Sequence, residues 1–252
     1  MKAGEKTIVL CENHGNYEAT WIENPFSKIR GSTDLWKTGC PKCIEEMENK
    51  ITKKADVEEK EKTLERYKRS NIEPLYLDST LEGFMAETQE QEKAKIAVRN
   101  LIEKENGKII MLGKNGTGKT HLAVCAVKAL GGKIYTMYEI STRIRATYSS
   151  KAKEDELEVA DELARIKMLV IDEIGRTKGS EAEENWLSYI IDKRNSRSLP
   201  LILISNKHSR KSCKENGCKD CIENYLSEDI MSRLCIDGKI LNFTGEDYRK
   251  KR

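Results

Sequence analysis

The stretch GKNGTGKT, residues 113–120, has the residue types and spacing of a loop that binds nucleotide phosphates. It follows an apolar segment and precedes a helical pattern, which is the context that such a loop requires. Its backbone amides and the start of the next helix direct partial positive charge at phosphate oxygens. We expect Lys119 to neutralise the β- and γ-phosphates of ATP and Thr120 to ligate Mg²⁺. The predicted nucleotide-binding residues are Gly113, Lys114, Asn115, Gly116, Thr117, Gly118, Lys119, Thr120 and His121.

Polar side chains also follow two later apolar segments. MLVIDE, residues 168–173, ends in Asp172, which can hold Mg²⁺, and in Glu173, which is placed to polarise a water for attack on the γ-phosphate. LILISN, residues 201–206, ends in Asn206. Ligands of open parallel sheets lie at the carboxyl ends of the strands, so we predict that Asn206 senses the γ-phosphate or orients the attacking water. A plain strand-to-loop transition is the alternative for Asn206.

The first part of the chain carries two pairs of metal-ligand types, Cys11-x-x-His14 and Cys40-x-x-Cys43. Each pair can grip one ion from a tight turn, and the two turns together complete a tetrahedron. A small module with little apolar material would gain its folding free energy from the metal. The pattern therefore predicts a structural Zn²⁺ site, with no open position for catalysis.

A second group of such side chains, His208, Cys213, Cys218 and Cys221, occurs near the end of the chain. Its spacing is irregular, and only Cys218 and Cys221 form a C-x-x-C pair. A second zinc site, a redox-sensitive trio of thiols and inert loop cysteines all stay open as interpretations.

Alternating strand and helix patterns are expected to position these groups. The strand candidates are residues 108–112, 133–138, 167–171, 199–204 and 239–243, and the helical stretches are 119–130, 139–149, 154–166 and 181–196. This alternation predicts a parallel sheet covered by helices.

Composition limits the class of protein. The formal net charge of +3 neither demands nor excludes nucleic acid. We find no apolar run long enough for a membrane span and no signal-peptide core, so we expect a cytoplasmic protein without a membrane segment. Disulfides do not persist in a reducing cytosol, and clustered cysteines there are more often metal ligands. The isolated Cys125 and Cys235 are predicted to be buried as small apolar side chains.

Three segments differ in composition. Residues 1–43 are predicted to form the zinc-binding module, residues 44–77 a charged helix with a connector, and residues 78–252 the nucleotide-binding domain. Ile44, Met47, Ile51 and Ala55 recur at helical spacing within the charged segment. This helix is either a solvated spacer or a surface that docks a partner.

The order GKNGTGKTHLA, LVIDEIG and ISN resembles the DnaC/IstB branch of the AAA+ ATPases. YKRSNIEPLY before the core, SEDIMSRL and the ending NFTGEDYRKKR extend the resemblance to roughly residues 64–252. The module in front is similar to that of phage-encoded DnaC-like proteins. The resemblance implies an α/β fold: an AAA+ P-loop core with a parallel five-stranded sheet flanked by helices, preceded by a small zinc-ribbon-like module and a charged helix.

The resemblance also implies a function. Helicase loaders of this branch dock an N-terminal region on a hexameric replicative helicase and place it on single-stranded DNA, with ATP as the switch and with self-assembly through the ATPase domain. By position, Arg233 matches the arginine that reaches a neighbouring subunit's γ-phosphate, and Arg249 matches the second sensor arginine. Family members often carry another arginine four positions before Arg233, where this chain has Asp229, so that second arginine's role is in doubt here.

Members of the branch carry an extra helix that touches single-stranded DNA. The matching stretch, residues 141–151, holds Arg143, Arg145, Tyr148 and Lys151. Cations beside an aromatic ring suit a surface that tracks the backbone and stacks bases. An ordinary solvated helix face is the alternative.

Two other functions stay open. An IstB-type transposition helper ATPase shares the core motifs, and a nucleotide-binding adaptor that barely hydrolyses ATP would share the fold. The front module and the YKRSNIEPLY connector favour the loader, and Glu173 with Arg233 argues against an inactive site. A generic zinc-finger DNA binder would leave most of the chain unexplained.

Overall fold

The structure is a computed structural model and describes residues 2–24, 35–176, 180–213, 215 and 218–250. It divides into two compact units, Met1–Leu64 and Glu65–Arg252. The three-part division into residues 1–43, 44–77 and 78–252 stays a prediction.

The first unit begins with an antiparallel sheet of three strands, β1 (Lys6–Cys11), β2 (Gly15–Glu23) and β3 (Leu35–Lys37). Three residues link β1 to β2, and the register pairs Cys11 with Gly15 at the turn. Ala19 is the one apolar side chain of this sheet that is buried among the described residues. The described part of this sheet therefore has little apolar packing, in line with the composition of the segment.

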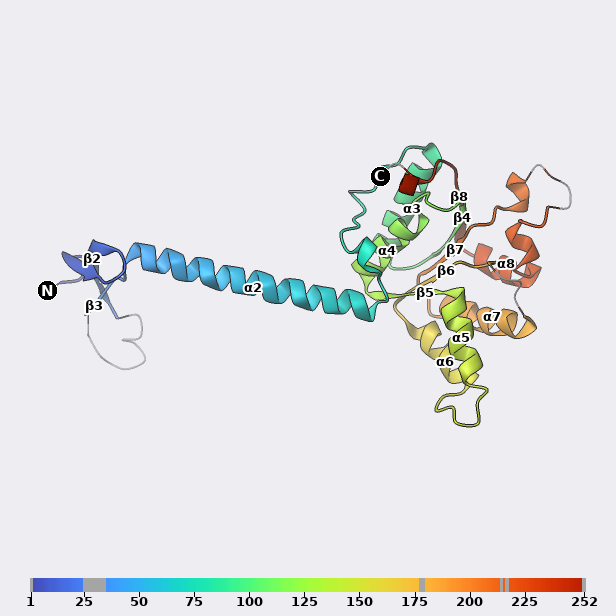
Figure 1. The fold of residues 1–252 in the computed structure, drawn as a ribbon, viewed down its shortest axis with the longest axis horizontal. Helices are drawn as coiled ribbons and strands as arrows, with labels where there is room; N and C mark the ends of the chain where they lie inside the picture. Colours follow the sequence, from blue (N-terminus) through green and yellow to red (C-terminus); the bar gives the residue numbers. More distant parts are fainter. Residues whose placement is uncertain (1, 25–34, 177–179, 214, 216–217, 251–252) are drawn as a thin grey trace. The chain divides into compact units, whose positions relative to one another are not determined.

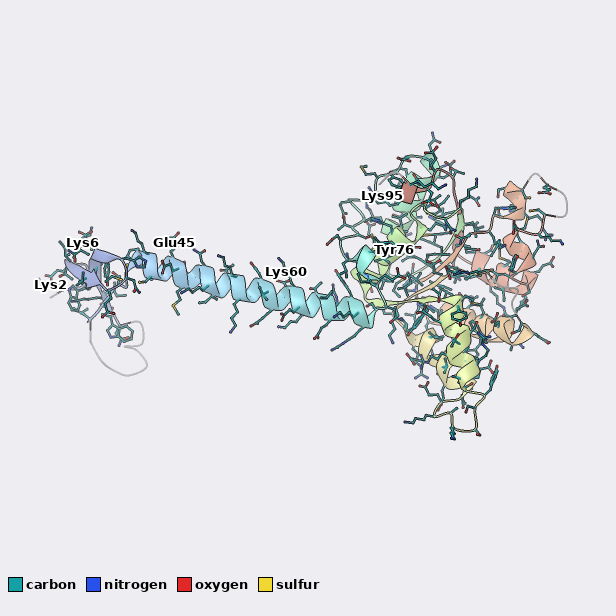
Figure 2. All side chains as sticks on the ribbon, in the orientation of Figure 1. Lys2, Lys6, Glu45, Lys60, Tyr76 and Lys95 are labelled. Atoms are coloured by element: carbon teal, nitrogen blue, oxygen red, sulfur yellow. The ribbon has the colours of Figure 1, made fainter. Side chains whose placement is uncertain are left out.

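The charged segment forms helix α2 (Pro41–Arg69), which confirms the predicted helix. No residue of α2, all of which the structure describes, is buried. The apolar residues at helical spacing are exposed, with Met47 retaining 65% and Ile51 59% of their accessible surface. Figure 2 shows side chains such as Glu45 and Lys60 extending from this helix.

The second unit is built on a five-stranded parallel sheet, as predicted (Figure 1). Its strands are β4 (Lys108–Gly113), β5 (Gly132–Thr136), β6 (Met168–Asp172), β7 (Leu201–Ser205) and β8 (Gly238–Phe243), in the order β5-β6-β7-β4-β8. The predicted strand at 133–138 is two residues too long. Thr136 caps helix α5 with its side chain, so Met137 and Tyr138 are helical.

Helices cover both faces of this sheet, and they alternate with the strands along the chain. Helices α3 (Gln89–Lys104) and α4 (Lys119–Leu130) pack on one face. Helices α5 (Met137–Ala146), α6 (Glu156–Arg165), α7 (Glu181–Ser196) and α8 (Glu228–Cys235) pack on the other. Short 3-10 helices are η1 (Pro74–Tyr76), η2 (Arg210–Ser212), η3 (Ile222–Asn224) and η4 (Tyr248–Lys250).

Two apolar cores follow from the pleat of the strands, because successive side chains point to opposite faces. Ile109 and Met111 of β4 join the core under α3 and α4. Ile110 and Leu112 join the core under α5 to α8. The central strands are thus buried on both faces, as expected for a parallel sheet.

A buried cation joins several chain segments in the second core. Arg194 of α7 is 1% exposed, and its guanidinium donates to the carbonyl oxygens of Ile166 (2.6 Å), Lys167 (3.2 Å) and Pro200. It also reaches the carbonyls of Leu163 and Ala164 at the end of α6. Burial lowers the pKa of Arg194 to about 9. Its hydrogen bonds offset the cost of desolvating the charge.

The two isolated cysteines, Cys125 and Cys235, differ in their exposure to solvent. Cys125 is buried, as predicted, and burial raises the pKa of its thiol to about 11. The prediction for Cys235 is wrong, because this residue is exposed. Helix α8 buries Ile230 and Leu234, four residues apart, and Cys235 follows the buried stripe by one position, which turns it toward solvent. Within the described residues, no helix is both long enough and apolar enough to cross a membrane.

Candidate nucleotide and metal sites

A cavity of about 910 Å³ opens in the second unit at the carboxyl ends of the sheet strands. The predicted loop residues Asn115–His121 line it, together with Asp172, Glu173 and Asn206. The structure therefore brings most of the predicted nucleotide site together in one place. Its remaining wall comes from residues that the sequence did not single out, namely Asn71, Glu73, Leu75, Tyr76, Asp78, Ser79, Gly83, Phe84, Met85, Val124, Ile134, Tyr135, Thr136, Glu139, Ile204 and Tyr248.

At two glycines of the loop, both the backbone conformation and the neighbouring atoms disfavour a side chain. Gly116 has φ of +74°, and a Cβ there would meet Asp247 Oδ1 at 1.6 Å. Gly118 has φ of +92°, and a Cβ there would meet the ring of Phe84 at 2.5 Å. Both conformations are left-handed, and both neighbours leave no room for a side chain. Phe84, which precedes the loop in the sequence, and Asp247, which follows it, thus both pack closely against the loop backbone.

The lysine of the loop is folded inward. Lys119 is buried, and its Nζ donates to the carbonyl oxygens of Gly113 and Lys114, each at 2.6 Å. These two predicted residues thus contribute backbone carbonyls beside the lysine. His121 Nε2 donates to the carbonyl of Thr80 at 3.0 Å, which fixes its ring at the edge of the cavity.

The two predicted magnesium ligands touch each other. Thr120 Oγ1 donates to Asp172 Oδ2 at 2.9 Å, although 52 residues separate them. Burial raises the pKa of the Asp172 carboxyl, and the hydrogen bond from Thr120 opposes that shift. A hydroxyl and a carboxylate as oxygen donors fit Mg²⁺, which is usually held by few protein ligands plus phosphates.

Glu173 lies beside this pair in an unusual conformation. Its φ of +59° is left-handed, which is rare for a residue other than glycine. The Glu173 amide donates a hydrogen bond to Asp172 Oδ1 at 2.6 Å. Glu173 Oε2 forms an ion pair with Arg176 Nη1 at 2.7 Å. The turn directs the glutamate into the cavity that Asp172 also lines. Strained backbone of this kind persists where the surroundings over-determine it.

Ser205, the last residue of β7, and Asn206, which follows it, have different surroundings. Ser205 is buried, and its Oγ donates to the carbonyl of Ile174 at 2.5 Å, which ties β7 to the turn after β6. The next residue, Asn206, lines the cavity. The geometry is compatible with the predicted role of Asn206, which stays a prediction.

Arg233 lies elsewhere. It belongs to α8 and forms ion pairs with Asp192 at 2.6 Å and with Asp229 at 2.9 Å. Among the described residues it does not line the cavity. The aspartate that stands where the family often has arginine thus holds Arg233 within its own chain.

The end of the chain reaches the phosphate-binding loop. The Tyr248 amide donates to the carbonyl of Gly116 at 3.0 Å, and the Tyr248 hydroxyl donates to the carbonyl of Met85 at 3.2 Å. The predicted sensor Arg249 follows directly, and its side chain lies outside the described residues. On the other side of the loop, Gln91 Nε2 donates to the carbonyl of Thr117 at 3.2 Å.

The side chains predicted to touch single-stranded DNA already have partners. Arg143 pairs with Glu154 at 3.1 Å and also with Glu162. Arg145 Nε donates to the Ser141 carbonyl at 3.1 Å, and the Tyr148 hydroxyl to Glu156 at 3.1 Å. The DNA contact stays a prediction, and acidic neighbours reduce the positive charge of this surface.

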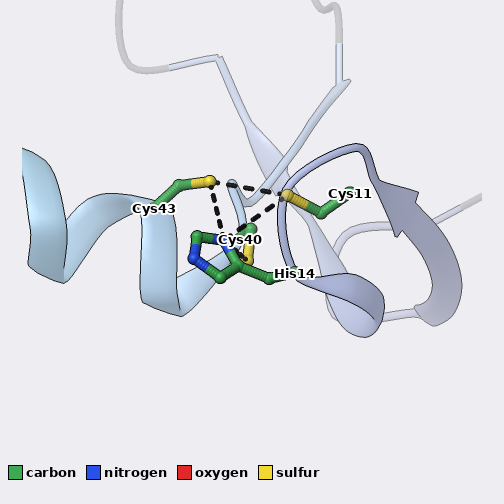
Figure 3. Close-up of side chains that lie close together, drawn as sticks. All are labelled: Cys11, His14, Cys40 and Cys43. Atoms are coloured by element: carbon green, nitrogen blue, oxygen red, sulfur yellow. Dashed lines mark hydrogen bonds between the residues drawn. The ribbon is translucent and has the colours of Figure 1, made fainter.

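The four predicted ligands of the first unit meet at one point (Figure 3). Their donor atoms all lie within 4.8 Å of one another, with His14 Nδ1 3.2 Å from Cys43 Sγ and Cys11 Sγ 3.4 Å from Cys43 Sγ. Cys11 and His14 come from the end of β1 and the hairpin turn, while Cys40 and Cys43 flank the start of α2. Three thiols and an imidazole in this arrangement fit a tetrahedral Zn²⁺.

Groups next to the cluster of Cys11, His14, Cys40 and Cys43 favour metal binding. His14 Nε2 lies 3.0 Å from Glu46 Oε1, the carboxylate contact that orients many metal-binding histidines. The backbone of Asn13, followed by Cys43 and His14, lowers the pKa of the Cys11 thiol to about 6. Thiolate is the form that binds metal. Sequence spacing predicted the four ligands, while Glu46 gave no signal of its own.

The strand–loop–helix unit from β4 to α4 and the acidic turn after β6 define the chain as a P-loop ATPase. A model of the family described as IstB-like ATP binding protein matches residues 43–252, and the chain belongs to that family. This confirms the predicted DnaC/IstB resemblance.

Individual relatives agree with this assignment. The chain is 29% identical to the replicative helicase loader DnaC of Escherichia coli K12 over 194 residues, 73% of this chain and 75% of the loader. It is 30% identical to a putative ATP-binding protein of insertion sequence IS21 from Pseudomonas aeruginosa, over 57% of this chain and 52% of that protein.

Solved structures share the fold. The crystal structure of the DnaC helicase loader superposes with a TM-score of 0.57 at 20% identity, covering 68% of this chain and all of that chain. The structure of DnaI gives a TM-score of 0.55 at 17% identity, covering 69% of this chain and 93% of that chain.

Proposed function

We propose that the chain is an ATP-dependent helicase loader that acts in DNA replication, binds a hexameric replicative helicase and places it on single-stranded DNA. The similarity to the Escherichia coli loader carries this proposal, because it spans about three-quarters of both chains and not only the nucleotide motifs. The cavity at the phosphate-binding loop supplies the switch.

In this proposal the predicted site residues of the cavity have separate tasks. Lys119 neutralises the β- and γ-phosphates of ATP, and the loop amides hold the phosphate oxygens. Thr120 and Asp172, which are already in contact, hold Mg²⁺, whose charge offsets that of the phosphates. Glu173 accepts a proton from the attacking water, and Asn206 orients that water.

Arg233 acts on a neighbouring chain. Its ion pairs with Asp192 and Asp229 keep it within its own α8 and α7, outside the cavity. Assembly of several chains brings the guanidinium to the adjacent γ-phosphate, where it stabilises the developing charge. Hydrolysis would therefore depend on assembly.

The front module serves as the docking piece, folded around Zn²⁺. Its sheet exposes Ile8 and Leu10 of β1, which retain 75% and 71% of their accessible surface. Ile22 and Trp36 are cross-strand partners in β2 and β3 and are also exposed. Exposed apolar side chains of this size on a small module are typical of surfaces that bind a protein partner.

Mixing the protein with its host's replicative helicase, with and without ATP, tests the proposal. A complex is expected with the wild-type chain, and the double variant Ile8→Lys, Leu10→Lys should lose it while still binding ATP. Glu12→Lys, at an exposed polar position of the same module, is the matched control. No helicase complex under any nucleotide condition would refute the loader.

Transposition is the second candidate, and the similarity to the IS21 ATP-binding protein favours it. Capture of a transposase in place of the helicase would decide for it.

Binding of single-stranded DNA is tested separately by titrating an oligonucleotide at two salt concentrations. An affinity that falls with salt and that drops in the double variant Arg145→Gln, Tyr148→Ala supports the DNA contact at residues 141–151.

A further inference from the structure

The second Cys/His group lies in the connection between β7 and α8, in the ATPase unit. The donor atoms of His208, Cys213, Cys218 and Cys221 all lie within 4.8 Å of one another. His208 Nε2 is 3.4 Å from Cys218 Sγ and 3.5 Å from Cys221 Sγ. The irregular spacing in the sequence therefore does not prevent the four side chains from converging.

Their separations match those of a metal site. A tetrahedral Zn²⁺ with the usual bond lengths separates sulfur and nitrogen donors by about 3.5–3.8 Å. Three thiolates and one imidazole are a soft donor set that suits Zn²⁺. This is the same donor set as in the front module.

The backbone holds the ligands in place. His208 and Cys221 form a parallel β-bridge, in which the Ile222 amide donates to the His208 carbonyl at 2.9 Å. The Asp220 amide lies 3.4 Å from Cys218 Sγ, a contact that stabilises thiolate charge. Cys221 is buried and precedes Ile222, which belongs to the core under α5 to α8. One end of the ligand set is thus anchored in the ATPase core.

Apolar burial contributes little to the placement of the described residues of this connection. Residues 206–220 contain no aliphatic or aromatic side chain. Hydrophobic packing, the usual source of order in a folded chain, is therefore unavailable to them. A metal bound by the four side chains would supply that free energy, as it does in small domains without a core.

We infer that His208, Cys213, Cys218 and Cys221 bind one structural Zn²⁺. The three thiols release their protons to solvent as the metal binds, and the histidine binds through neutral Nε2. All four positions are filled by the protein, so the site is closed and not catalytic. The metal closes the connection between Asn206, at the cavity, and η3, which leads into α8.

Metal content tests the site in the full-length chain. The variant Cys40→Ser, Cys43→Ser removes the front site and leaves the second one to be measured alone. We expect one zinc per chain in this background by elemental analysis, and two in the wild type. Adding Cys218→Ser should remove the remaining zinc, while adding Cys235→Ser, an exposed cysteine outside both groups, should leave it in place. Because Cys218 is only partly buried, its substitution spares the core.

Two further measurements use the same background. Reconstitution with Co²⁺ should give thiolate-to-cobalt absorption that Cys218→Ser abolishes. Trypsin should cut after Lys211 and Lys219 faster once a chelator removes the metal, while cleavage after Lys53 in α2 should not change. Absence of zinc, or a mass two daltons low that shows a disulfide within the trio, would overturn the inference.

Discussion

Glu173 Oε2 and Arg176 Nη1 lie 2.7 Å apart, so the proposed base of the ATPase site pairs with an arginine from its own turn. Replacing Glu173 by Gln removes the proton acceptor and keeps the side-chain shape. We expect ATP turnover to fall by about 10²–10⁴-fold, the usual contribution of a general base. ATP affinity should stay within a factor of about two, because Lys119 and the loop amides are unchanged. Steady-state phosphate release and nucleotide titration measure the two effects.

Arg176→Gln is the matched control for that variant. Arg176 is exposed, and an exposed ion pair contributes at most about 1 kcal/mol. That free energy corresponds to less than about a sixfold change in rate. A fall in turnover as large as that of Glu173→Gln would instead assign the chemistry to the pair.

Arg233 should act between chains. Arg233→Ala and Lys119→Ala are each expected to abolish turnover, for different reasons, while a mixture of the two regains part of it. A mixed contact is intact in one of its two orientations, in which the Arg233→Ala chain supplies the loop and the Lys119→Ala chain supplies the arginine. Phosphate release over a range of mixing ratios measures the recovery.

The control for Arg233 is Arg165→Ala, which removes another arginine with an aspartate four residues before it. It should turn over ATP like the wild type. If the mixture stays inactive while both variants still assemble, Arg233 does not serve a neighbour.

Removal of zinc should unfold the front module and leave the sheet of the ATPase unit folded, with any loosening in that unit confined to the connection that carries the second Cys/His group. Ala19 is its one buried apolar side chain among the described residues of the sheet, so no core replaces the metal. After chelation we expect backbone amides of β1 and β2 to exchange hydrogen rapidly, while those of β4 and β6 stay protected. Hydrogen exchange read by mass spectrometry distinguishes the two units. Protection of β1 that survives complete zinc removal would contradict a metal-dependent fold.

Arg194→Met should destabilise the ATPase unit severely. Methionine has similar length, yet it leaves the carbonyls of Ile166, Lys167 and Pro200 without their buried donor. We expect a loss of about 2–5 kcal/mol in the free energy of unfolding. Urea denaturation at unchanged m-value measures it, and Arg197→Met, at an exposed position of the same helix end, should have little effect.

Acid should weaken the contact between α5 and α6. Arg143 holds the pKa of Glu162 below its ordinary value. The pair therefore contributes stability above the unfolded carboxyl pKa, and this contribution is lost as the pH falls through the lower folded value. In Arg143→Gln we expect a shallower loss of stability on acidification than in the wild type. Arg145→Gln, with no carboxylate partner among its described contacts, should follow the wild-type curve.

The convergence of the loop residues with Asp172, and of the four front Cys/His side chains with one another, was predictable because each set obeys a local spacing rule. Lys119, Thr120 and Asp172 occupy fixed places relative to a strand and a helix, and the structure brings them into contact. The parallel direction of the strands was also predictable, since apolar runs alternate with helical patterns, while the order of the strands in the sheet was not predicted.

Contacts that depend on the tertiary fold were not predictable. Phe84 lies in a segment with no recognisable motif, and Asp247 lies in the ending that resembles the family. In neither case does the sequence show that the side chain approaches a glycine of the loop. Helix α3 was not identified, although Thr88 and Gln91 form a capping box that marks its start. The exposure of Cys235 depends on the face that α8 turns to the core, which a single cysteine does not reveal.

The guanidinium of Arg194 ties the starts of β6 and β7 to each other. It binds the carbonyl of Lys167, directly before β6, and that of Pro200, directly before β7. Both strands are short: β6 ends at Asp172, and β7 ends at Ser205, directly before Asn206. Asp172 and Asn206 both line the cavity. Sliding of one strand past the other would break a bond to the shared cation at the far edge of the sheet. The position of Asp172, the proposed magnesium ligand, relative to Asn206, the proposed sensor, is therefore fixed about a strand's length away from the cavity.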